Sequence, residues 1–339
     1  MIRLQDIAEI AGVSRTTVSN VIQGRTKRVS QKTIDKITKI IDEQGYVPNM
    51  ASMSLTGNVS KIIGIVTYSW IHGMHATMDS FVGEFIGTIA REAEEKGYYI
   101  MLIGGEDYNN VVSVASAWNM DGLIILGYSE KEHDILRKKL NKKMVLVDTY
   151  ASKEYTFQNV GVDDYSGGYQ IGEYLRECGY KKAVMFGESD EASDYYRWLG
   201  FKKAMEEEGG YCSKARFIVG STNKRERIYL YEKLIPQFLE AKAVAFTSDY
   251  TAIEAMNFFH DLGIKVPEQI SVAGFDNCIS ATLVRPRLTT VNQDVSKKAR
   301  TAFECLVRLI RGEELAEKNI RHEVNLIKRE SVKDRKNTF

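Results

Sequence analysis

A short polar stretch near the N-terminus, residues 14–22, carries side chains that suit the recognition of base edges. It reads Ser-Arg-Thr-Thr-Val-Ser-Asn-Val-Ile and follows a first short helical stretch at residues 6–10. Gly12 lies between the two and permits a tight left-handed turn, because it has no Cβ. Ser14 can accept a hydrogen bond from the free amides of the second helix. We therefore expect two short helices joined by a tight turn.

The second of these helices should present a polar face to solvent. Apolar positions 7, 8, 18, 21 and 22 can pack together as a small interior. The side chains left on the open face are Arg15, Thr16, Thr17, Ser19 and Asn20. Guanidinium, hydroxyl and amide groups at a helix start can hydrogen-bond to bases in a major groove. The alternative is a helical hairpin with an ordinary polar face.

The charge of the chain is distributed unevenly. The 339 residues carry a net charge of +1, but residues 1–61 hold nine Lys and Arg against five Asp and Glu, a net +4. The rest of the chain therefore carries −3. A basic N-terminal segment on an acidic body is a weak indication of a phosphate-bearing partner.

Composition and cysteine placement indicate a cytoplasmic globular protein. The length allows two or three domains, and 44% hydrophobic and 27% charged residues are ordinary for such proteins. No apolar run is long enough to span a membrane, and the N-terminus lacks the apolar core of a signal peptide. The four cysteines are scattered without metal-ligand spacing, so we expect reduced thiols.

The elements that would position this polar face form a small N-terminal bundle. Ser30 is placed to cap a third helix, in which Ile34, Ile37 and Ile41 recur at helical spacing and which ends at Gly45. Residues 50–57 are too few for an independently stable helix. We expect this segment to become ordered only against a partner; the alternative is a plain linker.

From Lys61 onward, strand and helix patterns alternate. The predicted strands are residues 62–66, 98–103, 122–126, 144–148, 183–186, 243–246 and 270–273. The predicted helices are residues 80–96, 165–178, 197–207 and 249–262. Continuous apolar strands alternating with helices are typical of parallel sheets buried on both faces. The fold class is therefore α/β, with two doubly wound lobes and a ligand site between them.

Several motifs, in order and spacing, resemble the LacI/GalR family of bacterial repressors. The headpiece match comprises Asp6-Ile7-Ala8, Ala11 to Ser14 and Thr17-Val18-Ser19. It extends through Val29-Ser30, Gly45 to Asn49 and Leu55. In the body, residues 266–276 and 288–291 are similar to the family's second-lobe signature. The resemblance covers nearly the whole chain and implies a helix-turn-helix headpiece, a hinge helix and two lobes like those of periplasmic binding proteins.

The resemblance implies specific DNA contacts. Arg15, Thr16 and Asn20 match positions that read base edges, and Thr17, Ser19 and Asn49 match positions that contact the backbone. Leu55 matches the leucine that wedges into the minor groove. Ser52 is also expected to contact DNA, although Ser52 and Met53 replace the commoner alanine and arginine of the hinge.

The resemblance also implies a small-molecule effector between the lobes. The residues that match effector-lining positions are Phe81, Asp148, Glu191, Ser193, Arg197, Ser248 and Asp276. A carboxylate after a strand, an arginine and aromatic rings fit a sugar best and a purine next. Asp249, next to Ser248, is expected to cap its own helix.

The domain organisation that follows has four parts. They are a headpiece (1–46), a hinge and linker (47–60), a first lobe (61–160 with 291–320) and a second lobe (161–290 with 321–339). The C-terminal tail lacks the leucine heptads that tie some relatives into tetramers, so we expect a homodimer.

Two further departures from the family pattern stand out. Arg3 occupies the position of a usual threonine cap, which should cost the first helix about 1 kcal/mol. The loop at residues 70–78 is longer than usual and contains His72 and His75. The two histidines could in principle hold a metal, but we expect them to belong to a surface loop, and no metal site or cofactor is predicted.

The function expected from these patterns is a ligand-responsive DNA-binding repressor. The alternative within this class is a purine-responsive or phosphoprotein-responsive regulator of the corepressor type. An exported solute-binding protein would share the two lobes but would have no use for residues 1–57. No nucleophile–base set, phosphate loop or metal cluster indicates an enzyme. The operator sequence, the effector and the sign of its effect do not follow from the sequence.

Overall fold

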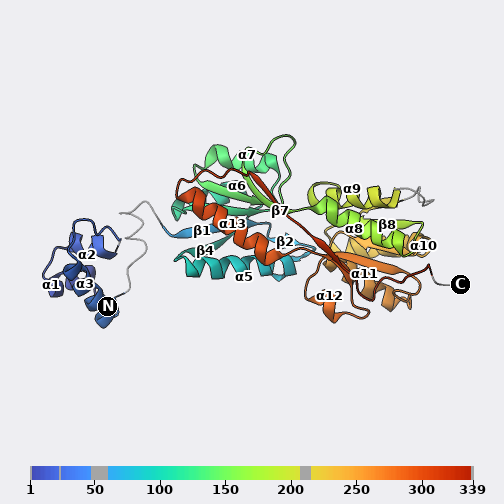
Figure 1. Cartoon of the computed structure of the whole chain (residues 1–339), viewed down its shortest axis with the longest axis horizontal. Coiled ribbons are helices and arrows are strands. Elements are labelled where there is room, and N and C mark those ends of the chain that lie inside the picture. Colours follow the sequence, from blue (N-terminus) through green and yellow to red (C-terminus); the bar gives the residue numbers. More distant parts are fainter. Residues whose placement is uncertain (1, 23, 47–59, 207–214, 337–339) are drawn as a thin grey trace.

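The computed structural model describes residues 2–22, 24–46, 60–206 and 215–336. A small helical headpiece lies at one end of the molecule, and two α/β lobes follow along its long axis (Figure 1). The predicted hinge segment, with Asn49, Ser52 and Leu55, lies outside the described residues.

The headpiece consists of three helices, α1 (Leu4–Ala11), α2 (Arg15–Ile22) and α3 (Gln31–Gln44). Its buried core comprises Ile7, Ala8, Ala11, Val18, Ile37 and Ile40. α1 ends at Gly12, whose φ of 69° is in the left-handed region that the turn requires. The hydroxyls of Ser14 and Ser30 accept hydrogen bonds from the amides of Thr17 and Thr33, at 3.1 and 3.3 Å. The predicted caps of α2 and α3 are thus confirmed.

The first lobe is a six-stranded parallel sheet covered by helices on both faces. Its strand order is β13 (Asn319–His322), β7 (Gln158–Val162), β6 (Lys143–Val147), β5 (Gly122–Leu126), β1 (Ile62–Thr67) and β4 (Tyr99–Gly104). α5 (Ser80–Glu95) and α13 (Val295–Ile310) cover one face, and α6 (Tyr108–Ala117) and α7 (Glu130–Lys139) cover the other. β1 and β5 are buried almost throughout, as their continuous apolar sequences predicted.

The second lobe repeats this three-layer arrangement. Its strand order is β14 (Asn325–Ile327), β12 (Thr289–Asn292), β11 (Ser271–Asp276), β10 (Ala243–Phe246), β8 (Ala183–Gly187) and β9 (Ala215–Val219). β14 is antiparallel to β12, and the other neighbouring pairs are parallel. α8 (Asp164–Glu177) and α9 (Ala192–Glu206) cover one face; α10 (Lys224–Ala241) and α11 (Asp249–Asp261) cover the other. The short helix α12 (Ser280–Leu283) follows β11.

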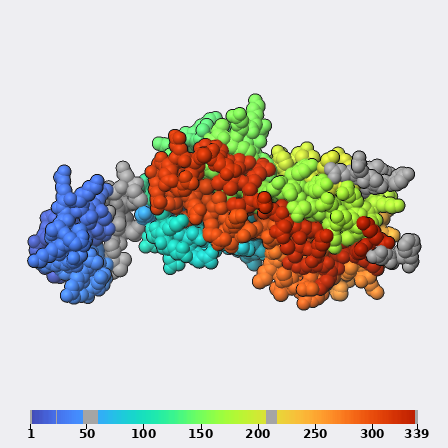
Figure 2. Space-filling view, viewed as in Figure 1, coloured from blue at the N-terminus to red at the C-terminus, as the bar shows by residue number. Residues whose placement is uncertain are grey.

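The chain passes between the lobes at three places. It leaves the first sheet after Val162, returns after Asn292 to form α13, and crosses again between His322 and Asn325. Residues late in the sequence, coloured orange to red, therefore run from one lobe onto the other (Figure 2). The residue boundaries proposed above for the four domains stay a prediction.

Some local predictions were wrong. The second-lobe helix expected to start at Arg197 begins at Ala192, because Ala192, Ser193 and Asp194 form its first turn rather than the end of a loop. Polar residues are favoured in first turns, where they satisfy free amides. The helices α6, α7 and α10 and the strand β9 were not predicted from the sequence. Within the part of the chain that is described, no helix has both the length and the apolar character needed to cross a bilayer.

Candidate functional site

The first candidate site is the exposed start of α2 in the headpiece. Arg15 and Thr16 are exposed, whereas Thr17, Ser19 and Asn20 are partly covered. The Thr17 hydroxyl lies 2.9 Å from that of Ser14, so it also supports the turn between α1 and α2. Lys36 of α3 donates to the Ala11 carbonyl at 2.8 Å and fixes the third helix against the same turn. The headpiece thus presents Arg15 and Thr16 on a braced helix start.

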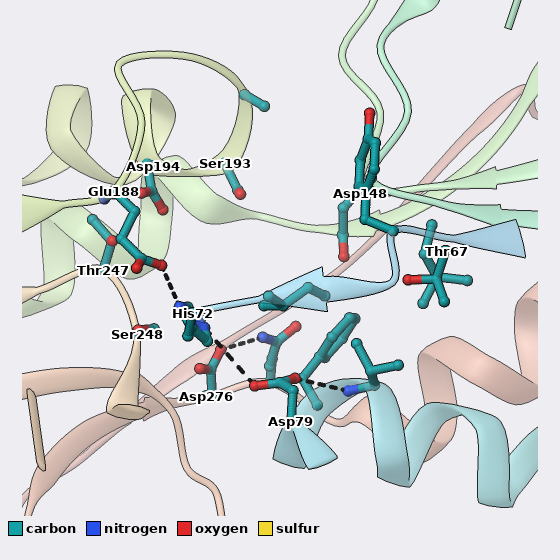
Figure 3. Close-up of a pocket in the computed structure, with 18 of the residues that line it drawn as sticks. Thr67, His72, Asp79, Asp148, Glu188, Ser193, Asp194, Thr247, Ser248 and Asp276 are labelled. Carbon is teal, nitrogen blue, oxygen red and sulfur yellow. Dashed lines mark hydrogen bonds and ion pairs between the residues drawn. The ribbon is translucent and has the colours of Figure 1, made fainter. Parts of the chain in front are cut away.

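The second candidate site is a cleft of about 280 Å³ between the lobes. Strand ends of both sheets meet there, as open α/β folds require of ligand sites. Six predicted effector residues line this cavity: Phe81, Asp148, Ser193, Arg197, Ser248 and Asp276. Glu191 does not line it and is exposed to solvent. Figure 3 shows Asp148 and Thr67 from the first lobe facing Ser193, Ser248 and Asp276 from the second.

A chain of buried hydrogen bonds joins the two strand-end carboxylates. Asp148 follows β6 and accepts from Lys298 Nζ with both carboxylate oxygens, at 2.9 and 2.8 Å. Lys298 Nζ also donates to Gln293 Oε1 at 2.7 Å, and Gln293 Nε2 donates to Asp276 at 2.5 Å. Lys298 is fully buried. The first-lobe and second-lobe sides of the cleft are therefore connected through one lysine and one amide.

Both strand-end carboxylates occupy strained backbone positions. Asp148 has a φ of 56° and Asp276 a φ of 123°, which side-chain-bearing residues rarely adopt. Such strain persists where the surrounding structure over-determines the conformation, and it is common at ligand sites. In this chain the unusual backbone conformations direct the carboxylates of Asp148 and Asp276 from their strand ends toward the cleft.

On the second-lobe side of the cleft, the lining residue Asp276 has the buried carboxyl group of Asp249 next to it. Desolvation, together with the Asp276 charge, raises the pKa of Asp249. Desolvation also raises the pKa of Asp276, although the Arg197 guanidinium opposes that shift. Asp249 does not cap α11 as predicted; Ser248 accepts the Thr251 amide, and Asp249 accepts from Thr290 Oγ1 at 2.6 Å and the Cys278 amide at 2.9 Å. The prediction failed because adjacent Ser and Asp are both good caps, and only Ser248 lies outside the first turn.

Arg197 is held rigidly at the second-lobe wall. Its Nε donates to Asp164 at 2.7 Å, Nη1 donates to the Thr247 carbonyl, and the guanidinium lies 3.6 Å from the centre of the Phe275 ring. α8 and α9 approach so closely that a Cβ on Gly168 would stand 1.8 Å from the Arg197 carbonyl oxygen. Glycine at position 168 therefore allows α8 and α9 to approach closely enough for Arg197 to reach Asp164.

Several polar groups of the cleft were not predicted from the sequence. His72, Asp79, Glu188, Asp194 and Gln293 all line it. Both His72 and His75 were predicted to lie on a surface loop. The prediction is correct for His75, which is exposed, and wrong for His72, whose side chain is largely buried. Glu188 could have been predicted from its position directly after the buried strand β8, whereas Asp194 lies in the first turn of α9, whose start was predicted wrongly.

His72 lines the cleft and lies between two carboxylates. Its Nδ1 contacts Glu188, and its Nε2 lies 3.8 Å from Asp79, as Figure 3 shows. Burial alone would lower the pKa of His72, but Glu188 and Asp79 outweigh it and raise the pKa. The imidazole is therefore biased toward its cationic form.

Carboxylates outnumber cations around the cavity. Its acidic lining residues are Asp79, Asp148, Glu188, Asp194 and Asp276. Arg197 and His72 are the basic lining residues, and both already contact carboxylates. Such a cleft repels anions and offers hydrogen-bond acceptors to hydroxyl or N–H groups. Within the described residues no His, Cys, Asp and Glu side chains are grouped as metal ligands would be.

Comparisons with known proteins agree with this geometry. Residues 3–49 match bacterial regulatory proteins of the lacI family, and residues 173–332 match the periplasmic binding protein-like domain. The HTH-type transcriptional repressor PurR of Vibrio atlanticus is 28% identical over 98% of this chain and 99% of its own length. That of Erwinia tasmaniensis is 29% identical over 98% of both chains.

Solved structures show the same fold. A lac repressor dimer bound to operator and the anti-inducer ONPF superposes with a TM-score of 0.82 at 22% identity, covering 98% of this chain and 99% of that one. A CelR–cellobiose complex superposes with a TM-score of 0.70 at 23% identity, covering 98% of this chain and all of the other. The headpiece and the two lobes are thus arranged as in known regulators.

Proposed function

Because this chain belongs to the LacI family of bacterial regulatory proteins, we propose that it is a repressor whose operator affinity is set by a small, uncharged, hydroxyl-rich molecule. The observation that carries the proposal is the combination of a braced recognition helix with an acidic cleft between two lobes. DNA binding and ligand binding then reside in separate parts of one chain, as allosteric control requires.

The DNA-binding arm of the proposal rests on α2. Arg15 and Thr16 are exposed at its first turn, where side chains of a recognition helix reach base edges. Thr17, Ser19 and Asn20 are partly covered and suit contacts that set the position of the helix. Asn49, Ser52 and Leu55 remain predicted contacts of the hinge.

Replacing Arg15 tests this arm. Arg15→Ala should weaken operator binding by about 1–3 kcal/mol, because a bidentate contact to a base is lost. The operator, selected from random duplexes, should be a pseudo-palindrome. Its affinity is measured by fluorescence anisotropy at fixed salt, with Lys39→Ala on the exposed face of α3 as control. An equal loss on specific and random DNA would make Arg15 a phosphate contact instead.

The effector arm rests on the charge and size of the cleft. A cavity of about 280 Å³ lies just below the usual size of small-molecule pockets, which span roughly 300–1,000 Å³. The excess of carboxylates disfavours phosphorylated ligands, and it suits sugar hydroxyls. A nucleobase is the second candidate, which the full-length likeness to PurR repressors favours. A thermal-shift screen of sugars and nucleobases separates the two, since a ligand at 100 times its Kd stabilises by about 2.7 kcal/mol.

The raised pKa of Asp276 predicts a pH dependence. In the free protein this carboxyl takes up a proton at a higher pH than an ordinary aspartate, whose pKa is about 4. A ligand hydroxyl donates its hydrogen bond to the ionised form of Asp276. Effector affinity should therefore fall as the pH is lowered from neutrality toward about 4. Isothermal titration of the effector across this range, with Glu191→Ala as control, measures the change. Affinity that rises on acidification would assign the acceptor role to another group.

Assembly completes the proposal. Large apolar side chains are exposed on both lobes, with Tyr99 and Leu102 on the edge strand β4 and Ile279 and Leu283 at the two ends of α12. Exposed apolar groups of this kind mark association surfaces. A two-fold homodimer would cover them and present two recognition helices to one operator in the cytoplasm.

A further inference from the structure

A hairpin of the first lobe reaches across the cleft and docks on the second lobe. Its strands are β2 (Trp70–Ile71) and β3 (Met74–His75), and His72 lies at its tip. The His72 carbonyl accepts from Arg227 Nη2 at 3.2 Å. Arg227 is fully buried and also donates to Glu188 and Glu254, each at 2.8 Å. The backbone of the tip is therefore anchored in the second lobe.

The His72 side chain is held against an aromatic ring. It stacks on Tyr250 of α11, with ring centres 4.7 Å apart and an angle of 11° between the planes. A flat ring thus covers one face of Tyr250.

This stack separates the cleft from a second cavity. The second cavity also measures about 280 Å³ and has Tyr250 in its wall, whereas His72 lines the first. Both cavities share Asp79, Phe81 and Asp276. The remaining residues of the second cavity are Ser80, Lys224, Asp249, Ile253, Glu254, Asn257, Cys278 and Ser280. The two cavities are therefore adjacent chambers over a common floor, with the stacked pair between them.

We propose that the second chamber is a subsite for a second sugar ring, so that the effector is a disaccharide and His72 is the partition it displaces. This inference rests on the proposed function, because the first ring occupies the cleft already described. Asp276, common to both chambers, would accept hydroxyl hydrogen bonds near the linkage between the rings.

The chemistry of the second chamber fits a sugar ring. Sugars present apolar faces and a rim of hydroxyls, so their sites combine an aromatic or aliphatic wall with a few polar groups. Tyr250 and Ile253 supply such a wall, and Asn257 and Ser280 can exchange hydrogen bonds with hydroxyls. Together the chambers fall within the usual size range of ligand pockets, whereas either one alone lies just below it.

His72 can move without loss of the hairpin anchor. Arg227 holds the carbonyl of His72, whereas only the side chain covers Tyr250. Rotation of the side chain breaks its contacts with Glu188 and Asp79, opens the partition and places a ligand ring where the imidazole now lies.

Filling the second chamber tests the inference. Asn257 is an exposed residue of α11, so Asn257→Phe should block this chamber without disturbing the core. Ser280→Phe blocks it from a different element, and His260→Phe, one turn further along α11 and outside both chambers, is the matched control. The full chain and each variant are titrated calorimetrically with glucose, galactose, cellobiose, maltose and lactose, and with the nucleobases of the thermal-shift screen.

The expected result is that one disaccharide binds the unsubstituted chain at least tenfold more tightly than either monosaccharide. Asn257→Phe and Ser280→Phe should each remove that advantage, roughly tenfold or about 1.4 kcal/mol, and His260→Phe should retain it. The second subsite is overturned if a monosaccharide binds more tightly than every disaccharide and its affinity is the same for the unsubstituted chain and both blocking variants. The proposed function would still stand in that case. Binding of nucleobases alone, or of no probe, would overturn the sugar assignment as well.

Discussion

Asp276→Ala is expected to abolish the response to the effector while leaving operator binding without ligand near normal. Asp276 lies at the end of β11 and is a carboxylate shared by both chambers of the cleft. Hydrogen bonds to charged groups contribute about 1.5–3 kcal/mol each, so losing two hydroxyl contacts should weaken effector binding more than a hundredfold.

The variant should still fold. Desolvation raises the pKa of Asp276, which means that burying its ionised form is unfavourable. Removing the carboxyl group removes this unfavourable contribution to stability. The substitution leaves Gln293 Nε2 without its acceptor, but Gln293 Oε1 still accepts from Lys298. The headpiece is remote from the change, so its DNA contacts are unaffected (Figure 1).

The measurement is operator titration with and without the effector identified by the screen. Asp276→Asn keeps the shape but removes the charge, so it should respond partially. Glu191→Ala, an exposed residue outside the cavity, should respond fully. Full response of Asp276→Ala at the same ligand concentration would show that the effector binds elsewhere.

The contrast between Asp276 and Glu191 shows what the sequence could predict. Asp276 directly follows a continuous apolar strand, and in parallel sheets such a position opens onto the ligand side. Glu191 lies in a polar run with no apolar pattern, so its position depended on where α9 begins. The helix starts at Ala192 rather than Arg197, and Glu188 and Asp194 face the cleft instead.

His72 and Arg227 could not be predicted because their partners are distant in the sequence. The hairpin tip is 155 residues from Arg227, and no local pattern relates the two. The burial of Lys298 could have been predicted, because this residue lies on the apolar face of α13 with Val295, Ala299, Ala302 and Phe303. A lysine on a buried stripe requires a carboxylate partner, and Asp148 at the end of a strand was available.

Lys298→Met should destabilise the body by about 3–5 kcal/mol, since removing one partner of a buried ion pair leaves the other uncompensated. Lys298 is fully buried and donates to Asp148 and Gln293, so the change also leaves Gln293 Oε1 without its donor. Methionine is similar in length and apolar, and this choice limits the cavity left behind. The loss is measured as the free energy of unfolding in urea.

Three further variants separate the ion pair from the packing: Lys297→Met, Asp148→Asn alone, and Asp148→Asn combined with Lys298→Met. Lys297→Met changes the neighbouring exposed lysine and should shift stability by no more than about 0.5 kcal/mol. The double variant Lys298→Met with Asp148→Asn should be more stable than Lys298→Met alone, because no buried charge is then unpaired. If the double variant loses the sum of the single effects, Asp148 and Lys298 do not interact energetically. If the double variant loses less stability than the sum of the single effects, the two side chains interact. The ion pair then holds Asp148 in its strained backbone conformation, from which it faces the effector across the cleft.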